Sequence, residues 1–208
     1  MIKLVGTSHI SPYSIRKIKE ELDEEPDCVA VELDEGRYRA MKSGERGDYP
    51  SLFFKILSWI QKRLGEKTGV LPGEEMLSAT EGAIERDIKV YLIDRPIHIT
   101  VKRFEKIGLL EKIKLFLFSI GKLRGCDFDL AEVPSYKIIE ESLNVMKRRA
   151  PKMYSVLVEE RDKVMVEVLV SLAERHDTVL VVVGAGHIPG IKGMLQEKNV
   201  DFVDKTFK

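Results

Sequence analysis

The chain has 208 residues, of which 44% are hydrophobic and 33% are charged, and this composition excludes a disordered protein. Its 34 Lys and Arg residues balance its 34 Asp and Glu residues, so charge gives no argument for binding nucleic acid or an anionic membrane. No apolar run reaches the roughly 20 residues that cross a bilayer. Met1 leads directly into a predicted strand, so we expect no signal peptide, and the two cysteines favour a reduced, cytoplasmic setting.

The first part of the chain predicts a strand, a helix and a second strand. Residues 2–5 form an apolar strand, and apolar residues recur at helical spacing over 12–24. Residues 28–31 form the second strand. A strand, a helix and a strand within about 30 residues are typical of a βαβ unit, which predicts a parallel pair and a right-handed crossover.

The rest of the chain alternates in the same way. A third strand is predicted at 89–93, and a fourth, the most apolar, at 179–183. Thr100 is a candidate cap for a short helix that ends at Gly108. The other expected elements are helices at 35–42, 51–64, 74–87, 109–120, 136–149, 151–175 and 190–198, and an edge strand at 200–203.

We therefore predict an α/β fold in which helices flank a mainly parallel or mixed central β-sheet. The whole chain, 1–208, is expected to form one domain with helical insertions near 43–72 and 104–150. The helices at 51–64 and 109–120 are unusually rich in large apolar side chains. A core position is the ordinary explanation, and the alternatives are a cover over a site, a dimer surface or a membrane-facing patch.

Two Gly-x-x-His turns follow strands at opposite ends of the sequence. Gly6 to His9 follows the first strand, and Gly184 to His187 follows the fourth. Gly6, Gly184 and Gly186 allow a sharp turn and a close approach to a ligand, although tight strand-to-helix turns would explain them equally well. Because ligands bind at the carboxyl edge of open α/β sheets, we expect the two turns to meet there.

Four predicted strands end in polar groups, namely His9, Glu32, Asp94 and His187. Two histidines with one or two carboxylates predict a divalent-metal site or an acid–base pair. Each residue also has an ordinary explanation, since Glu32 could cap a helix or pair with Arg37, and Asp94 could form a local ion pair with Arg95. It is the agreement of four separate strand ends that favours a site.

Several common motifs are absent from the sequence. The third glycine of a dinucleotide fingerprint would fall at position 189, which is proline. There is also no Gly-x-Ser-x-Gly elbow, no Walker loop and no His-Glu-x-x-His helix. These absences argue against a nicotinamide cofactor and remove the usual support for serine-hydrolase and nucleotide-hydrolase interpretations.

The sequence resembles the TraB/PrgY family, whose wider relatives include the TIKI proteins and the erythromycin esterase/ChaN-like group. The resemblance extends from residue 1 to about 191 and is carried by GTSHIS at 6–11, PDCVAVELDEGRY at 26–38, PGEEM at 72–76, LIDR at 92–95, EERD at 159–162 and VVGAGHIPGI at 182–191. It implies an α/β fold and a proposed metal-dependent peptidase activity. PrgY-type members are linked to shutdown of secreted peptide pheromones.

The resemblance also implies roles for particular residues. The matching positions are His9, Glu32, Arg37, Glu75, Asp94, Arg95, Glu160, Arg161 and His187. Our hypothesis is a metallohydrolase in which His9 and His187 bind Mn²⁺, Co²⁺ or Zn²⁺, with Glu32 or Glu75 completing the ligand set. Glu75 or Glu160 would be the general base, and Arg95 or Arg161 would stabilise an oxyanion or orient a carboxylate.

Other interpretations remain open. The same pocket could belong to a non-catalytic protein that binds a peptide or a haem-like ligand through its histidines. The apolar helices could form a homodimer interface that encloses the pocket. Many family members continue into a C-terminal membrane region that is absent after Lys208, so the sequence predicts either a soluble short form or a truncated membrane-associated protein.

Overall fold

The computed structural model describes residues 1–8, 12–43, 74–108, 110–111 and 135–206. Its centre is a five-stranded sheet with the strand order β3-β2-β4-β1-β5. All four strand pairs are parallel, which confirms the α/β class and the parallel pairing. The strands are β1 (Ile2–Thr7), β2 (Cys28–Val31), β3 (Lys89–Leu92), β4 (Val179–Gly184) and β5 (Phe202–Asp204).

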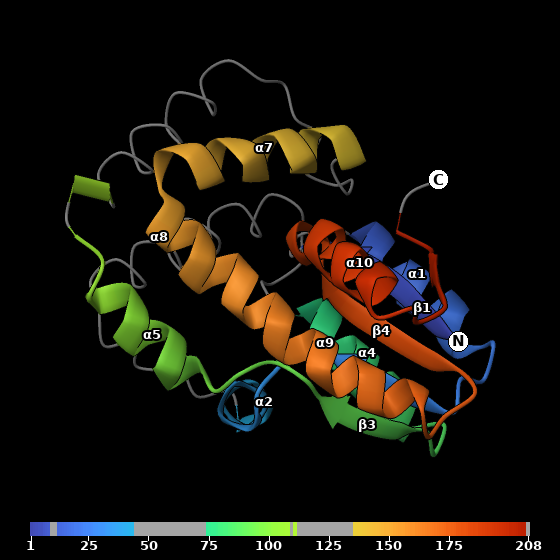
Figure 1. Ribbon diagram of the computed structural model, residues 1–208. Helices are drawn as coiled ribbons and strands as arrows, with labels where there is room; N and C mark the ends of the chain where they lie inside the picture. Colours follow the sequence, from blue (N-terminus) through green and yellow to red (C-terminus); the bar gives the residue numbers. More distant parts are fainter. Residues whose placement is uncertain (9–11, 44–73, 109, 112–134, 207–208) are drawn as a thin grey trace.

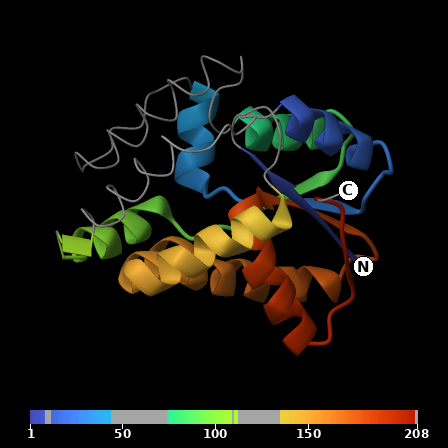
Figure 2. The same ribbon diagram turned by 90° about the horizontal axis from the view of Figure 1, so that it is seen from above.

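Helices cover both faces of this sheet (Figures 1 and 2). One layer contains α1 (Pro12–Leu22) and α4 (Glu74–Ile84), and the other contains α9 (Glu160–Ala173) and α10 (Ile188–Glu197). β4 is buried along its whole length, because it lies in the middle of the sheet and between the two layers. This explains its continuous run of valine and leucine.

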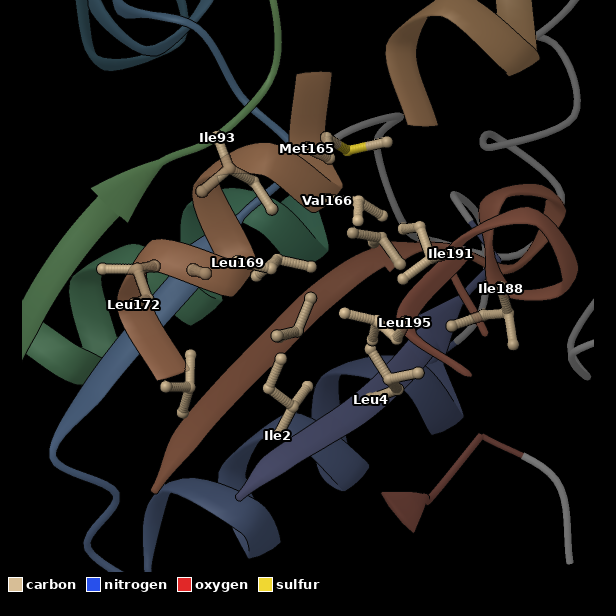
Figure 3. Packing of buried hydrophobic residues seen from close by; sticks show 14 of the residues in the cluster. Ile2, Leu4, Ile93, Met165, Val166, Leu169, Leu172, Ile188, Ile191 and Leu195 are labelled. Atoms are coloured by element: carbon tan, nitrogen blue, oxygen red, sulfur yellow. The ribbon is translucent and has the colours of Figure 1, made fainter. Parts of the chain in front are cut away.

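Alternate residues of the strands divide into two hydrophobic cores, as the period of two in a strand requires. The core beneath α9 and α10 contains strand residues Ile2, Leu4, Cys28, Ala30, Val179, Val181 and Val183 and helix residues Met165, Val166, Leu169, Leu172, Ile188, Ile191 and Leu195 (Figure 3). The core beneath α1 and α4 contains Val5, Val29, Val31, Leu180, Val182, Ile18, Leu22, Met76, Ala79 and Ala83.

A third, smaller core joins helices that lie beside the sheet. These helices are α5 (Ile97–Glu105), α7 (Tyr136–Arg149) and α8 (Pro151–Tyr154), followed by a π-helical turn at Ser155–Glu159. The third core consists of Val101, Phe104, Ile107, Ala150, Met153 and Val156. In Figure 1, α5 and α8 lie near the first turn of α9, at the opposite end of that helix from the loop that leads into β4.

Most element predictions agree with the structure, including α2 (Glu35–Ser43), and the final strand begins two residues later and ends one residue later than predicted, at Phe202–Asp204. Two details were wrong. Thr100 does not cap α5: Pro96 precedes that helix, and the Thr100 hydroxyl accepts a hydrogen bond from Arg95. The helix predicted at 151–175 is interrupted by the π turn. This interruption was not predicted, because an i→i+5 insertion has no strong sequence signal.

Part of the predicted helical content lies outside the described residues. This applies to the helix at 51–64, to nearly all of the helix at 109–120, to all but the first residue of the insertion predicted near 43–72, and to the middle of the insertion predicted near 104–150. Among the helices that the structure describes, none combines the length and the apolar character needed to cross a membrane.

Candidate functional site

Polar residues gather at the carboxyl edge of the sheet because the strands are parallel. Glu32 follows β2, Asp94 lies two residues after β3, and His187 ends a 3₁₀ turn, Ala185–His187, that follows β4. A helix that leads into a parallel strand begins at this same edge, so the first turn of α9 delivers Arg161 and Asp162 to it. Five side chains from four segments therefore converge at one place.

Arg161 is at the centre of this cluster. Its Nε donates to Asp94 Oδ1 at 3.0 Å and its Nη2 donates to Asp94 Oδ2 at 2.6 Å, which makes a two-pronged ion pair. Nη2 also donates to Glu32 Oε1. Nη1 lies 3.1 Å from His187 Nε2 and 3.2 Å from the Leu157 carbonyl oxygen. One guanidinium thus contacts side chains that follow three different strands.

His187 is held by a buried carboxylate. Its Nδ1 lies 2.5 Å from Asp162 Oδ1, and Asp162 is only 1% exposed. Its Nε2 lies 3.4 Å from Glu32 Oε1. The second oxygen of Glu32 accepts the backbone N–H of Gly184 at 2.6 Å. The Asp162 contact therefore fixes the imidazole so that Nε2 faces Glu32.

The charges of this cluster determine its protonation. Burial alone would lower the pKa of His187, but the charge of Glu32 and the hydrogen bond to Asp162 raise it to about 9. Burial alone would raise the pKa of Glu32, but the charges of His187 and Arg161 hold it well below its usual range. At neutral pH the free protein therefore has an imidazolium and a guanidinium beside the Glu32 carboxylate.

Asp162 depends on a close approach between α9 and α10. A Cβ added to Gly190, near the start of α10, would lie 2.1 Å from Asp162 Oδ2. Only glycine leaves room for the carboxylate there. Neither residue was assigned a role from the sequence: both lie within the motifs that carry the family resemblance, but a helix-to-helix approach has no local sequence signature.

A second polar cluster, which we call the Arg95 corner, lies next to the Arg161 cluster. It comprises Arg95, Thr100, Arg103, Val156 and Glu160. Arg95 donates through Nε to Thr100 Oγ1 at 2.8 Å and through Nη2 to the Val156 carbonyl oxygen at 2.5 Å. Its Nη1 bonds Glu160 Oε2 at 2.5 Å, and Arg103 binds the same oxygen at 2.7 Å.

The surroundings of Glu160 also affect its charge. Burial alone would raise the pKa of Glu160, but the hydrogen bonds from Arg95 and Arg103 lower it. The Arg95 corner therefore joins α5 to the π turn and to the start of α9 through charge-assisted hydrogen bonds.

Two pairings proposed from the sequence differ from those observed. Arg37 Nη1 donates to Asp94 Oδ2 at 2.9 Å, so the described partner of Arg37 is Asp94 and not Glu32. The contact between Arg95 and Asp94 is made by the Arg95 backbone N–H, at 2.8 Å, while the guanidinium turns into the Arg95 corner. Asp94 is thus shared by Arg37 and Arg161.

The other predicted site residues have different surroundings. His9 lies outside the described residues. Glu75 is fully buried in the first turn of α4, which begins at the carboxyl edge because α4 leads into β3.

The glycines of the two predicted turns differ in the space around them. Gly6 donates its N–H to Thr206 Oγ1 at 2.6 Å, and a Cβ there would lie 2.6 Å from Thr206 Cγ2. Gly186 differs, because a Cβ there would contact nothing within 4 Å.

The described ranges offer few donors for a metal ion. They contain no group of three or more His, Cys, Asp and Glu side chains arranged to hold an ion. Within them the candidate donors reduce to a pair, His187 Nε2 and Glu32 Oε1, with Arg161 in contact with both.

The sequence is similar to proteins from archaea and from mammals. An uncharacterized protein of Methanocaldococcus jannaschii is 34% identical over 94% of this chain and 53% of its own length. The TraB domain-containing proteins of Bos taurus and Homo sapiens are 28% and 26% identical, and each alignment covers 92% of this chain and 61% of the mammalian protein. The chain thus spans between half and two thirds of the length of these relatives.

A family model agrees with this similarity. The model of the TraB/PrgY/gumN family matches residues 1–199, which include every strand except β5 and every residue of the cluster around Arg161. A match over nearly the whole chain confirms the resemblance carried by the strand-end motifs, and the chain belongs to the TraB/PrgY/gumN family.

Proposed function

We propose that the protein is a metal-dependent hydrolase whose site lies at the carboxyl edge of the sheet. The observation that carries this proposal is the orientation of His187. A buried carboxylate at its Nδ1 turns Nε2 toward Glu32. Metal-binding histidines in proteins are usually held in this way by a carboxylate on the other ring nitrogen.

The spacing of the two donors fits an ion. Two ligands about 2.1 Å from one ion lie about 3.0–3.4 Å apart at octahedral or tetrahedral angles. His187 Nε2 and Glu32 Oε1 are 3.4 Å apart. We propose His9 as a further ligand, because its Gly-x-x-His turn follows β1, whose carboxyl end lies beside that of β4. Mn²⁺, Co²⁺ and Zn²⁺ all suit such a mixed set.

When bound, such an ion lowers the pKa of a water molecule to about 7 and polarises a substrate carbonyl. The charge of Arg161 would stabilise the negative charge that develops on the carbonyl oxygen. We assign the general base to Glu75 and not to Glu160, because two arginines bind Glu160 and lower its pKa. Hydrolysis then adds water to the carbonyl carbon and breaks the bond to the leaving amine, which receives the proton from the base.

Peptides are the substrate class that we propose. This part of the proposal rests on the family resemblance, since the described residues do not show a peptide-binding groove. Arg37 is a candidate for substrate contact, because its side chain is 27% exposed and lies next to Asp94 at the rim of the cluster.

Metal stoichiometry is the first test. The full chain is stripped with EDTA, dialysed against each of the three ions and analysed by inductively coupled plasma mass spectrometry. We expect about one ion per chain in the wild type, and loss of the ion in His187→Ala and in His9→Ala. His98→Ala is the matched control, because His98 is exposed on α5 and should leave the ion in place.

Peptide cleavage is the second test. The loaded protein is incubated with a mixed peptide library, and new termini are identified by mass spectrometry. Cleavage that disappears in His187→Ala supports the proposal. Metal retained in His187→Ala would contradict the ligand assignment, and tight binding of a peptide or haem-like ligand without cleavage would favour a non-catalytic binding protein.

A further inference from the structure

Arg161 lies where a cation between Glu32 and His187 would be placed. Its Nη1 is 3.1 Å from His187 Nε2, and its Nη2 binds Glu32 Oε1. These are the two donor atoms of the proposed metal site, and they are 3.4 Å apart. A guanidinium and a divalent ion cannot both contact these two donors from the same position, because their atoms would overlap.

Asp94 gives Arg161 a second point of attachment. Nε and Nη2 bind its two carboxylate oxygens at 3.0 and 2.6 Å, and Asp94 is 8% exposed. Neither of these contacts needs Glu32 or His187. The guanidinium can therefore move its Nη1 and Nη2 atoms away from the metal donors while the Nε contact to Asp94 persists, and the buried charge stays paired.

We propose that Arg161 takes the place of the divalent ion in the metal-free protein and is displaced when the ion binds. This inference rests on the proposed metal site and adds its regulation, since Arg161 sets how tightly the site binds metal. The displaced guanidinium, still held at Asp94 through Nε, keeps its donors beside the site. Arg161 thus stabilises the cluster when no ion is bound, and it provides hydrogen-bond donors when the ion is bound.

Calorimetric titration with Mn²⁺ tests the competition. Arg161→Met removes the charge at similar length, and Arg103→Met is the control, because Arg103 is a half-exposed arginine of α5 whose described ion-pair partner is Glu160. We expect Arg161→Met to bind Mn²⁺ at least about tenfold more tightly than the wild type, since two charge-assisted contacts no longer compete. Arg103→Met should stay within about threefold of the wild type.

Arg161→Met leaves two buried carboxylates without this partner, so a test in the wild type is also needed. Phenylglyoxal modifies accessible guanidinium groups, and the modified residues are identified by mass spectrometry. Saturating Mn²⁺ should increase modification of Arg161. Modification of Arg95 should not change, because its contacts lie in the Arg95 corner.

The outcomes separate this inference from the proposed function. If the wild type binds Mn²⁺ and Arg161→Met binds it equally or more weakly, displacement is wrong and the metal site stands. Unchanged modification of Arg161 at saturating Mn²⁺ would overturn displacement in the same way. If neither the wild type nor Arg161→Met binds any of the three ions, both proposals fail.

Discussion

Two arginines near the same π turn have very different surroundings. Arg95 donates to the Val156 carbonyl and Arg161 to the next carbonyl, Leu157. The other side-chain partners of Arg95 lie in α5 and at the start of α9. Arg161 instead contacts groups that follow β2, β3 and β4.

This difference separates a structural ion cluster from a candidate site. The described side-chain contacts of Arg95 are to a hydroxyl, a carbonyl and a carboxylate. Together these contacts hold α5 against the π turn and the start of α9. Arg161 shares its partners with a histidine whose pKa is raised to about 9 and with a carboxylate whose pKa is strongly lowered. The distinguishing feature is that these charged groups come from the ends of three parallel strands, where α/β proteins bind ligands.

The largest effect on stability should come from the Arg95 corner. Arg95→Met leaves Val156 and Thr100 without a buried donor, so we expect a loss of about 2–5 kcal/mol in the free energy of unfolding. Arg103→Met is the matched control, because it binds the same Glu160 oxygen from a side chain that is 54% exposed and should cost about 0–1 kcal/mol. Urea denaturation measures both. Equal losses would show that Arg95 has no special structural role.

The next effect concerns the orientation of His187. Asp162→Asn keeps the shape of the side chain but removes its charge, and we expect the affinity for Mn²⁺ to fall about 10–100-fold. Glu159→Gln, on the exposed side of the same helix start, is the control. Calorimetric titration gives both values, and an unchanged affinity in Asp162→Asn would show that Nδ1 needs no carboxylate.

The space at Gly190 provides an independent test of the same contact. Gly190→Ala places a methyl group against Asp162, so we expect it to cost about 1–3 kcal/mol in stability and to weaken Mn²⁺ binding. Gly193→Ala lies one turn further along α10, where a Cβ meets nothing within 4 Å, and should be neutral or up to about 1 kcal/mol stabilising. Thermal unfolding with and without Mn²⁺ compares the two variants.

The smallest effect is a dependence of stability on pH at Glu160. Its arginine partners lower the pKa of Glu160 in the folded state, so its contribution is present above the unfolded pKa of about 4.5. That contribution is lost as the pH falls through the folded-state pKa. Wild type and Glu160→Gln should therefore differ by about 1 kcal/mol at pH 6 and converge in acid, as followed by urea denaturation. A constant difference down to pH 3 would contradict this assignment.

The sequence predicted the parts of the site that follow from strand order. Glu32, Asp94 and His187 were found because each follows an apolar run, and parallel pairing places those ends together. The sequence could not separate the roles of Arg95 and Arg161, since each stands beside an acidic neighbour in the chain. Their roles depend on which way each side chain turns in three dimensions.

Asp162, Gly190 and the π turn were beyond prediction for a related reason. Asp162 matters because α10 approaches α9 closely at Gly190, and this contact joins segments that are 28 positions apart in the numbering. The π turn adds one residue within an otherwise regular helical pattern, so periodicity alone predicts a continuous helix. Both features depend on packing between elements rather than on local preference.

A crystal structure of the Mn²⁺-loaded protein, with the ion located by anomalous scattering, tests the central claim most directly. We predict an ion within about 2.3 Å of His187 Nε2 and of a Glu32 oxygen, with Arg161 turned away and still paired with Asp94. An ion bound elsewhere, or Arg161 still between Glu32 and His187 in crystals that contain stoichiometric Mn²⁺, would contradict the account.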